Sequence, residues 1–127
     1  MGRTIAILAM LAATNFALAD TAGAGAADVL AVEAFALPAA GQDVVRFRVT
    51  VRHADAGWAH YADRWEVLAP DGTLLGARVL AHPHDDEQPF TRSGDIVVPD
   101  GIDTVTVRAR DRLHGHGGQE MTVTIRR

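Results

Sequence analysis

The chain has 127 residues, a formal net charge of −4 at pH 7 and no cysteine. This length suggests a single domain, and the acidic charge argues against a nucleic-acid partner. Without cysteine, disulfide bonds and thiolate metal sites are excluded, and we expect no lipid anchor of the kind attached through a cysteine.

The first residues have the form of an export signal. A basic start at Arg3 precedes an apolar run over residues 5–13 and an Ala-x-Ala sequence that ends at Ala19. The apolar run is too short for a permanent membrane span. We therefore expect residues 1–19 to be a cleaved signal peptide and the protein to be periplasmic or secreted, with no membrane insertion after cleavage.

The remainder predicts a flexible N-terminus over residues 20–27 and a β-sandwich domain over residues 28–127. Small Ala and Gly residues dominate the first segment, which has little apolar surface to pack. The domain has about seven short strands separated by turns, and it shows no helical periodicity. The predicted strands are 29–37, 45–51, one around Trp65, 74–80, 95–98, 104–110 and 121–125.

This pattern is typical of an all-β, immunoglobulin- or fibronectin-III-like antiparallel sandwich, with a small closed barrel as the alternative. The second strand alternates clearly, with Val45, Phe47, Val49 and Val51 on one side. Trp65 is the expected core anchor. An Asp-Gly pair that ends at Gly72 indicates a hairpin turn after its strand.

Strand direction predicts which loops lie together. Because successive antiparallel strands alternate in direction, the loops 53–62, 82–92 and 111–119 should share one end of the sandwich. The tight turns at 39–43, 71–72 and 100–101 should share the other. Long, chemically varied loops at one end of a rigid scaffold are typical of a functional surface.

All six histidines lie in or beside those three loops: His53, His60, His82, His84, His114 and His116. Two of the loops contain a His-x-His pair, whose rings can point to the same side of an extended chain. Neutral imidazoles suit Zn(II) or Cu(II). The predicted metal ligands are His60, His82, His84, His114 and His116.

His53 and four carboxylates lie near the predicted ligands in the sequence. We interpret His53, at the end of a strand, as structural. Nearby carboxylates could act as ligands or could orient an imidazole ring. These carboxylates are Asp55, Asp63, Glu87 and Asp111.

The main alternative is a non-enzymatic β-sandwich module that binds a protein or small ligand. Its loop histidines would then be structural, and Trp58, Tyr61 and arginines would anchor the partner. No catalytic residues are predicted, because no nucleophile elbow or oxyanion motif accompanies the Ser and Thr residues. A metalloenzyme would also need an open coordination position and a substrate cleft, which the sequence does not indicate.

Three strings carry a resemblance to known proteins: His60-Tyr-Ala-Asp-Arg-Trp-Glu-Val67, His82-Pro-His-x-x-Glu-Gln-Pro-Phe-Thr-Arg-Ser93 and His114-Gly-x-Gly-Gly118. In these strings the chain resembles an uncharacterised family of small exported proteobacterial β-sandwich proteins. The resemblance implies export and a single β domain, and it implies no activity. The histidines therefore carry the functional prediction, which is a periplasmic Zn(II) or Cu(II) carrier or chaperone that could also contact a periplasmic protein partner.

Overall fold

Alternating apolar and polar side chains produce seven strands in the computed structural model, which describes residues 25–127. In the second strand the four predicted core residues, Val45, Phe47, Val49 and Val51, are all fully buried. A short 3-10 helix, η1 (Pro38–Ala40), follows the first strand. The strands are β1 (Asp28–Ala36), β2 (Val44–Arg52), β3 (Ala62–Leu68), β4 (Leu74–Val79), β5 (Phe90–Val97), β6 (Thr104–Asp111) and β7 (Met121–Thr124).

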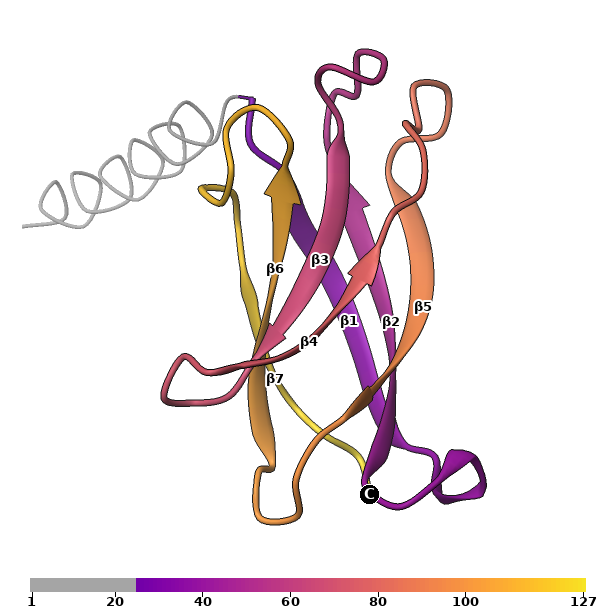
Figure 1. The fold of residues 1–127 in the computed structure, drawn as a ribbon, viewed down its shortest axis with the longest axis vertical. Coiled ribbons are helices and arrows are strands. Elements are labelled where there is room, and N and C mark those ends of the chain that lie inside the picture. The colour runs from indigo at the N-terminus through magenta and orange to yellow at the C-terminus, as the bar shows by residue number, and fades with distance from the viewer. Residues whose placement is uncertain (1–24) are drawn as a thin grey trace, which may run out of the picture.

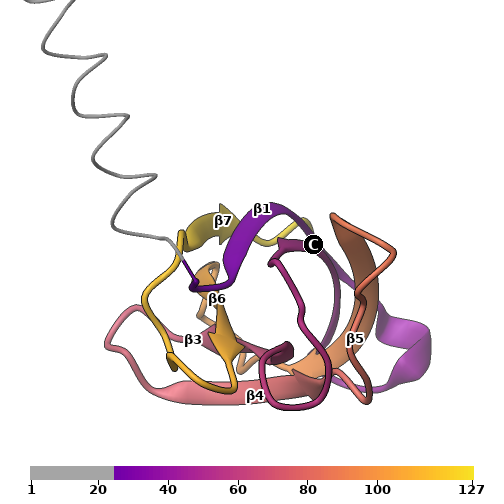
Figure 2. The same cartoon turned by 90° about the horizontal axis from the view of Figure 1, so that it is seen from above.

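The strands form two antiparallel sheets that face each other. One sheet has the order β1-β2-β5 and the other has the order β4-β3-β6-β7. Figure 2 shows the two sheets around a common interior, with β1 beside β7 and β4 beside β5. The structure confirms the predicted all-β sandwich of immunoglobulin or fibronectin type.

The core lies between the sheets and is centred on Trp65 of β3. This side chain is fully buried, and its ring lies 6.3 Å from that of Phe47 in the opposite sheet. Gly94 of β5 allows the two sheets to approach each other closely here, because a Cβ at position 94 would lie 3.0 Å from the Trp65 ring of the opposite sheet. The core therefore holds the strand ends, and the loops that follow them, in fixed positions.

The three histidine-bearing loops lie at one end of the sandwich, as predicted (Figure 1). The start of β1 reaches the same end, while the tight turns project toward the opposite one. Contacts join the loops directly: the backbone N–H of Arg112 donates to the carbonyl of Tyr61, and that of His53 donates to the side chain of Gln88. Segments far apart in the sequence therefore form one rim.

The fifth strand is longer than the predicted range 95–98, because it begins at Phe90. Its early residues pair with β2, where Phe90 faces Val51 and Thr91 faces Thr50. The two threonine hydroxyls are 2.8 Å apart, and Phe90 is buried in the core. The local sequence has no clean alternation here, so pairing with β2 determines the strand rather than intrinsic propensity.

The predicted signal peptide, residues 1–19, lies outside the described residues, as do residues 20–24 of the predicted flexible segment. Of that segment, residues 25–27 are described, and Ala27 is buried. Within residues 25–127, no helix has the length and hydrophobicity needed to cross a bilayer.

Candidate metal centre

Asp111 lies at the centre of the rim and is completely buried. It is the last residue of β6 and pairs with Ala62, the first residue of β3. Its Oδ1 accepts hydrogen bonds from the backbone N–H groups of Leu113 (2.6 Å) and His114 (2.8 Å). These two bonds hold the carboxylate in one orientation and direct Oδ2 toward the other loops.

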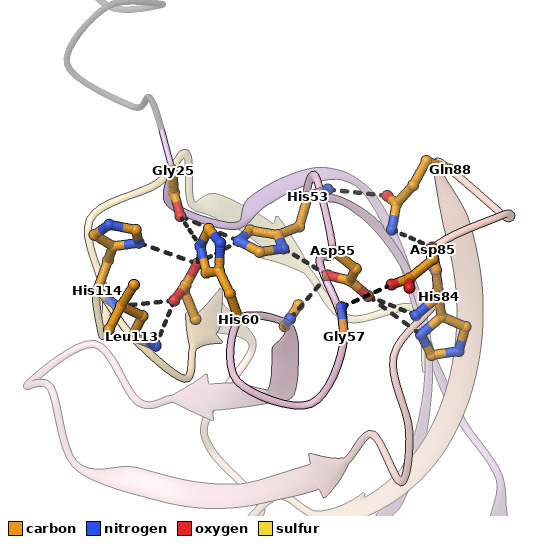
Figure 3. Close-up of polar contacts among 12 residues, drawn as sticks. Gly25, His53, Asp55, Gly57, His60, His84, Asp85, Gln88, Leu113 and His114 are labelled. Atoms are coloured by element: carbon orange, nitrogen blue, oxygen red, sulfur yellow. Dashed lines mark hydrogen bonds and ion pairs between the residues drawn. The ribbon is translucent and has the colours of Figure 1, made fainter.

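Three imidazoles from different parts of the chain converge on Asp111 Oδ2. Figure 3 shows the rings of His53, His60 and His114 next to one another. His60 Nε2 is 2.8 Å from this oxygen, His114 Nδ1 is 3.3 Å from it, and His53 Nε2 also contacts it. The ring of His60 lies 4.8 Å from that of His53 and 4.9 Å from that of His114. One donor atom from each of His53, His60 and Asp111 falls within 4.8 Å of the others.

A second buried carboxylate, Asp55, holds the ring of His53. Asp55 Oδ1 lies 2.5 Å from His53 Nδ1 and also accepts the backbone N–H of Ala62 at 3.0 Å. Its Oδ2 accepts the backbone N–H of His84 at 2.6 Å. Asp55 thus ties together two of the rim loops and the beginning of β3, and it orients His53.

Two oxygen atoms face Nε2 of His53, so this nitrogen needs a bound proton or metal ion. If Nδ1 donates its proton to Asp55, a neutral ring has only a lone pair at Nε2. That atom faces two oxygens, Asp111 Oδ2 and the Gly25 carbonyl at 3.1 Å. A second proton or a metal ion at Nε2 resolves this repulsion, since either one supplies positive charge between the nitrogen and the oxygens.

The protonation of His53 reflects the same balance. Burial of the ring lowers its pKa, but hydrogen bonds to Asp55, Asp111 and the Gly25 carbonyl outweigh that effect. The net pKa of His53 is therefore above its ordinary value. A metal ion can bind Nε2 only by displacing this proton, so metal binding should release a proton and strengthen as pH rises.

The Asp111 carboxylate supplies a fixed negative charge. Burial raises its pKa, but hydrogen bonds from the His114 backbone and side chain, the Leu113 backbone and the His53 side chain lower it more. The resulting pKa is about 2, so this buried group is ionised at any physiological pH.

Two imidazole nitrogens, from His53 and His60, and a carboxylate oxygen of Asp111 form a compact group of donors, and His114 Nδ1 approaches the same oxygen from outside this group. Imidazole nitrogen and carboxylate oxygen suit Zn(II) or Cu(II). A tetrahedral ion with bonds of about 2.0–2.1 Å separates its donors by roughly 3.3 Å. The His114–Asp111 contact already has this separation, whereas His60 would need to move outward by roughly 0.5 Å and His53, which contacts Asp111 Oδ2 more closely, would need to move further. The Asp55–His53 pair corresponds to the carboxylate–histidine contact that commonly orients a metal-bound ring.

His82 and His84 lie together on the other side of Asp55 and do not join these donors. The His84 ring is buried and stacks on Phe90, with centroids 3.9 Å apart and an interplanar angle of 10°. Neither of its ring nitrogens forms a hydrogen bond within residues 25–127, although Nδ1 is 3.9 Å from Asp55 Oδ2. His82 is exposed, lies 4.7 Å from the His84 ring and directs Nδ1 toward the Pro83 carbonyl at 3.0 Å.

His84 is held in its neutral form. Burial lowers its pKa, and the positive charges of Arg92 and His82 lower it further. It therefore acts mainly as an aromatic plug under the rim in this arrangement.

His116 is separate from the cluster and contacts the outer face of the β3–β6 pair. Its Nε2 is 3.0 Å from Oε1 of Glu66, a buried acid that also binds Arg64 (2.7 Å) and Arg108 (2.8 Å). Burial raises the pKa of Glu66, but the hydrogen bond from Arg108 and the charges of His116 and Arg64 lower it more. This ion group accounts for the position of His116.

The structure thus brings together two of the five predicted ligands, His60 and His114, and adds His53 and Asp111 to them. It places three predicted ligands elsewhere: His82, His84 and His116. Asp111 was one of the four carboxylates predicted as possible ligands, whereas His53 was interpreted as structural, and strand periodicity singles out both. His53 continues the inward-facing series of β2, and Asp111 continues that of β6, so both face inward where their strands meet the rim.

Over 87 residues the chain is 48% identical to a protein of Halomicrobium mukohataei named "Putative lipoprotein". The match covers 68% of this chain and 43% of that protein, so the chain spans less than half of its relative. No family model and no solved structure matches. The relative comes from a halophilic archaeon, and the resemblance to a proteobacterial family is therefore not supported.

Proposed function

We propose that this protein binds a divalent transition-metal ion, Zn(II) or Cu(II), and serves as a carrier or chaperone for it. The proposed ligands are His53, His60, His114 and Asp111. The observation that carries the proposal is the convergence of three imidazole nitrogens on one oxygen of a buried, ionised carboxylate.

Unequal burial of the ligands favours a carrier. The side chain of His53 is 1% exposed, whereas those of His60 and His114 are 25% and 44% exposed. An ion at this position would be held from below by His53 and Asp111 and would be reached from outside past His60 and His114. A partner protein could then exchange ligands with the two outer imidazoles, which suits the transfer of an ion rather than its permanent burial.

We place this function outside the cytoplasm, in the periplasm or as a secreted protein. The predicted signal peptide supports export, and the name of the archaeal relative points the same way for that protein.

Equilibrium dialysis of the purified protein against Zn(II) and Cu(II) tests the proposal. We expect one ion per chain, lost in the double variant His60→Ala/His114→Ala. The matched control is His82→Ala/His116→Ala, which removes two loop imidazoles that lie outside the cluster. Failure of the wild-type protein to bind stoichiometric metal, or equal retention by both double variants, would reject the function.

A second candidate is a non-enzymatic module that binds a protein or a small ligand, with structural histidines. It is favoured by two exposed apolar side chains, Trp58 (62% exposed) and Leu113 (66% exposed), on the loops that carry His60 and His114. A pull-down from extract with and without a chelator separates the two functions. Capture that requires metal supports the carrier, and capture that ignores the chelator supports the module.

A further inference from the structure

We infer that the backbone carbonyl oxygen of Gly25 is an additional metal donor and that the segment entering β1 forms one wall of the site. The inference rests on the proposed function, because it identifies a further ligand for the same ion. It would make the site a joint product of the two loops that carry the proposed ligands and the N-terminal segment of the domain.

The Gly25 carbonyl faces the same two nitrogens as Asp111. Its oxygen is 3.1 Å from His53 Nε2 and 3.3 Å from His60 Nε2, and both nitrogens also contact Asp111 Oδ2. In Figure 3 the carbonyl points into the space between the rings. An ion held by these nitrogens would meet the carbonyl as an extra oxygen donor, and backbone carbonyls serve as long, weak ligands in some copper sites.

The backbone conformation at position 25 favours glycine. Its φ is +85°, a conformation that L side chains rarely adopt. A Cβ there would lie 2.8 Å from Cε1 of His114 and 3.2 Å from both nitrogens of that ring. The bare backbone therefore lets the carbonyl approach the cluster while the His114 ring packs against it.

The loop that carries His114 also holds this segment in place. The backbone N–H of Gln119 donates to Asp28 Oδ1 at 2.7 Å, and the N–H of Val29 donates to the carbonyl of Gln119 at 2.8 Å. A Cβ at Gly118 would collide with the carbonyl of Ala27. Because the backbones meet directly at Gly118 and Ala27 and are hydrogen-bonded beside them, the position of Gly25 is tied to the ligand-bearing loop.

Zn(II) affinity, measured by competition with a chromophoric chelator, tests the inference in glycine variants. Gly25→Ala should weaken binding by on the order of tenfold or more. The control is Gly72→Ala, since Gly72 has a similar φ of +89°, has open space around its Cβ position and lies in a turn away from the rim. The control should bind like the wild type, and equal affinities in both variants would overturn the inference.

A second measurement uses the wild-type protein and is independent of how well Gly25→Ala folds. With carbonyl-¹³C glycine, the chain carries 12 labelled positions that NMR can follow. Saturating Zn(II) should shift the Gly25 carbonyl resonance and leave that of Gly72 in place. A bound ion without a Gly25 shift would overturn the inference and leave the proposed function standing, whereas a wild-type protein that binds no Zn(II) would overturn both.

Discussion

Asp55 lies 2.5 Å from Nδ1 of His53, and this contact determines which nitrogen of the ring faces the rim. The carboxylate is itself held by the backbone N–H groups of Ala62 and His84, so it cannot turn away without breaking them. His53 is therefore oriented by a support that reaches across two loops. The geometry of the proposed metal site depends on residues that do not touch the ion.

The first prediction concerns this support. Asp55→Asn keeps the shape of the side chain, removes its charge and puts an NH2 group in place of one of the two oxygens that accept backbone N–H groups. Both changes weaken the support of His53 and its basicity toward a metal. We expect Zn(II) affinity to fall by about 10- to 100-fold, as measured by isothermal titration calorimetry. The matched control is Asp95→Asn, which removes the charge of a carboxylate paired with Arg46 on β2. Undiminished affinity in Asp55→Asn would show that the orientation of His53 does not matter for binding.

The second prediction concerns Asp111 and acid stability. Its folded-state pKa is about 2, below the ordinary value of 3.8. A depressed carboxyl pKa contributes stability that is fully present above 3.8 and is lost as pH falls through about 2. The contribution amounts to about 2 kcal/mol. Urea unfolding of the metal-free protein should show the difference between wild type and Asp111→Asn narrowing by this amount from pH 5 to pH 2, and a constant difference would contradict the pKa.

The third prediction concerns His53, whose pKa is raised. A raised histidine pKa contributes stability that is fully present below the unfolded value of 6.5 and is lost as pH rises through the folded value. The free energy of unfolding of metal-free wild type should therefore exceed that of His53→Gln most below pH 6.5. The excess should shrink at higher pH.

The comparison with His53→Gln is necessary because the pKa of His84 is shifted in the opposite direction to that of His53. Its lowered pKa contributes stability above 6.5 that is lost as pH falls, and this term cancels when both proteins retain His84. Chemical denaturation at pH 5, 7 and 9 provides the measurement. Zn(II) should restore wild-type stability at high pH, where it replaces the lost proton, and should not do so in His53→Gln.

The fold was predictable because strand periodicity and turns act locally. The inward series from Val45 to Val51 and the burial of Trp65 follow from alternation alone, and strand direction correctly placed the three loops at one end. The start of β5 at Phe90 was not predictable, since it depends on pairing with β2 across a long separation in sequence.

The candidate site was only partly predictable because His-x-His spacing does not specify where a ring points. His116 turns to a buried acid, Glu66, whose burial between two arginines no local pattern indicates. The alternation that places His53 and Asp111 on the inward side is present in the sequence. The predicted strands, 45–51 and 104–110, end before these two residues, so the inward series was not extended to them.

The fourth prediction separates the His84 pocket from the metal site. The His84 ring is buried on Phe90, and both of its nitrogens lack hydrogen bonds within residues 25–127. Leucine has a similar size and no polar atoms, so it removes two buried nitrogens that lack hydrogen-bond partners within this range of the chain. His84→Leu should therefore change the free energy of unfolding by less than about 1.5 kcal/mol. The control is Phe90→Ala, which leaves a cavity and should cost about 3–5 kcal/mol.

Metal binding supplies the second readout for His84→Leu. The proposed donors are Asp111 and the three imidazoles around it, and they do not include His84. The backbone N–H of His84, rather than its side chain, supports Asp55. The variant keeps that N–H and should therefore bind Zn(II) with wild-type affinity in the same calorimetric titration. Loss of binding would mean that His84 leaves Phe90 to coordinate the ion, and the donor set would then have to be rebuilt around the His82–His84 pair.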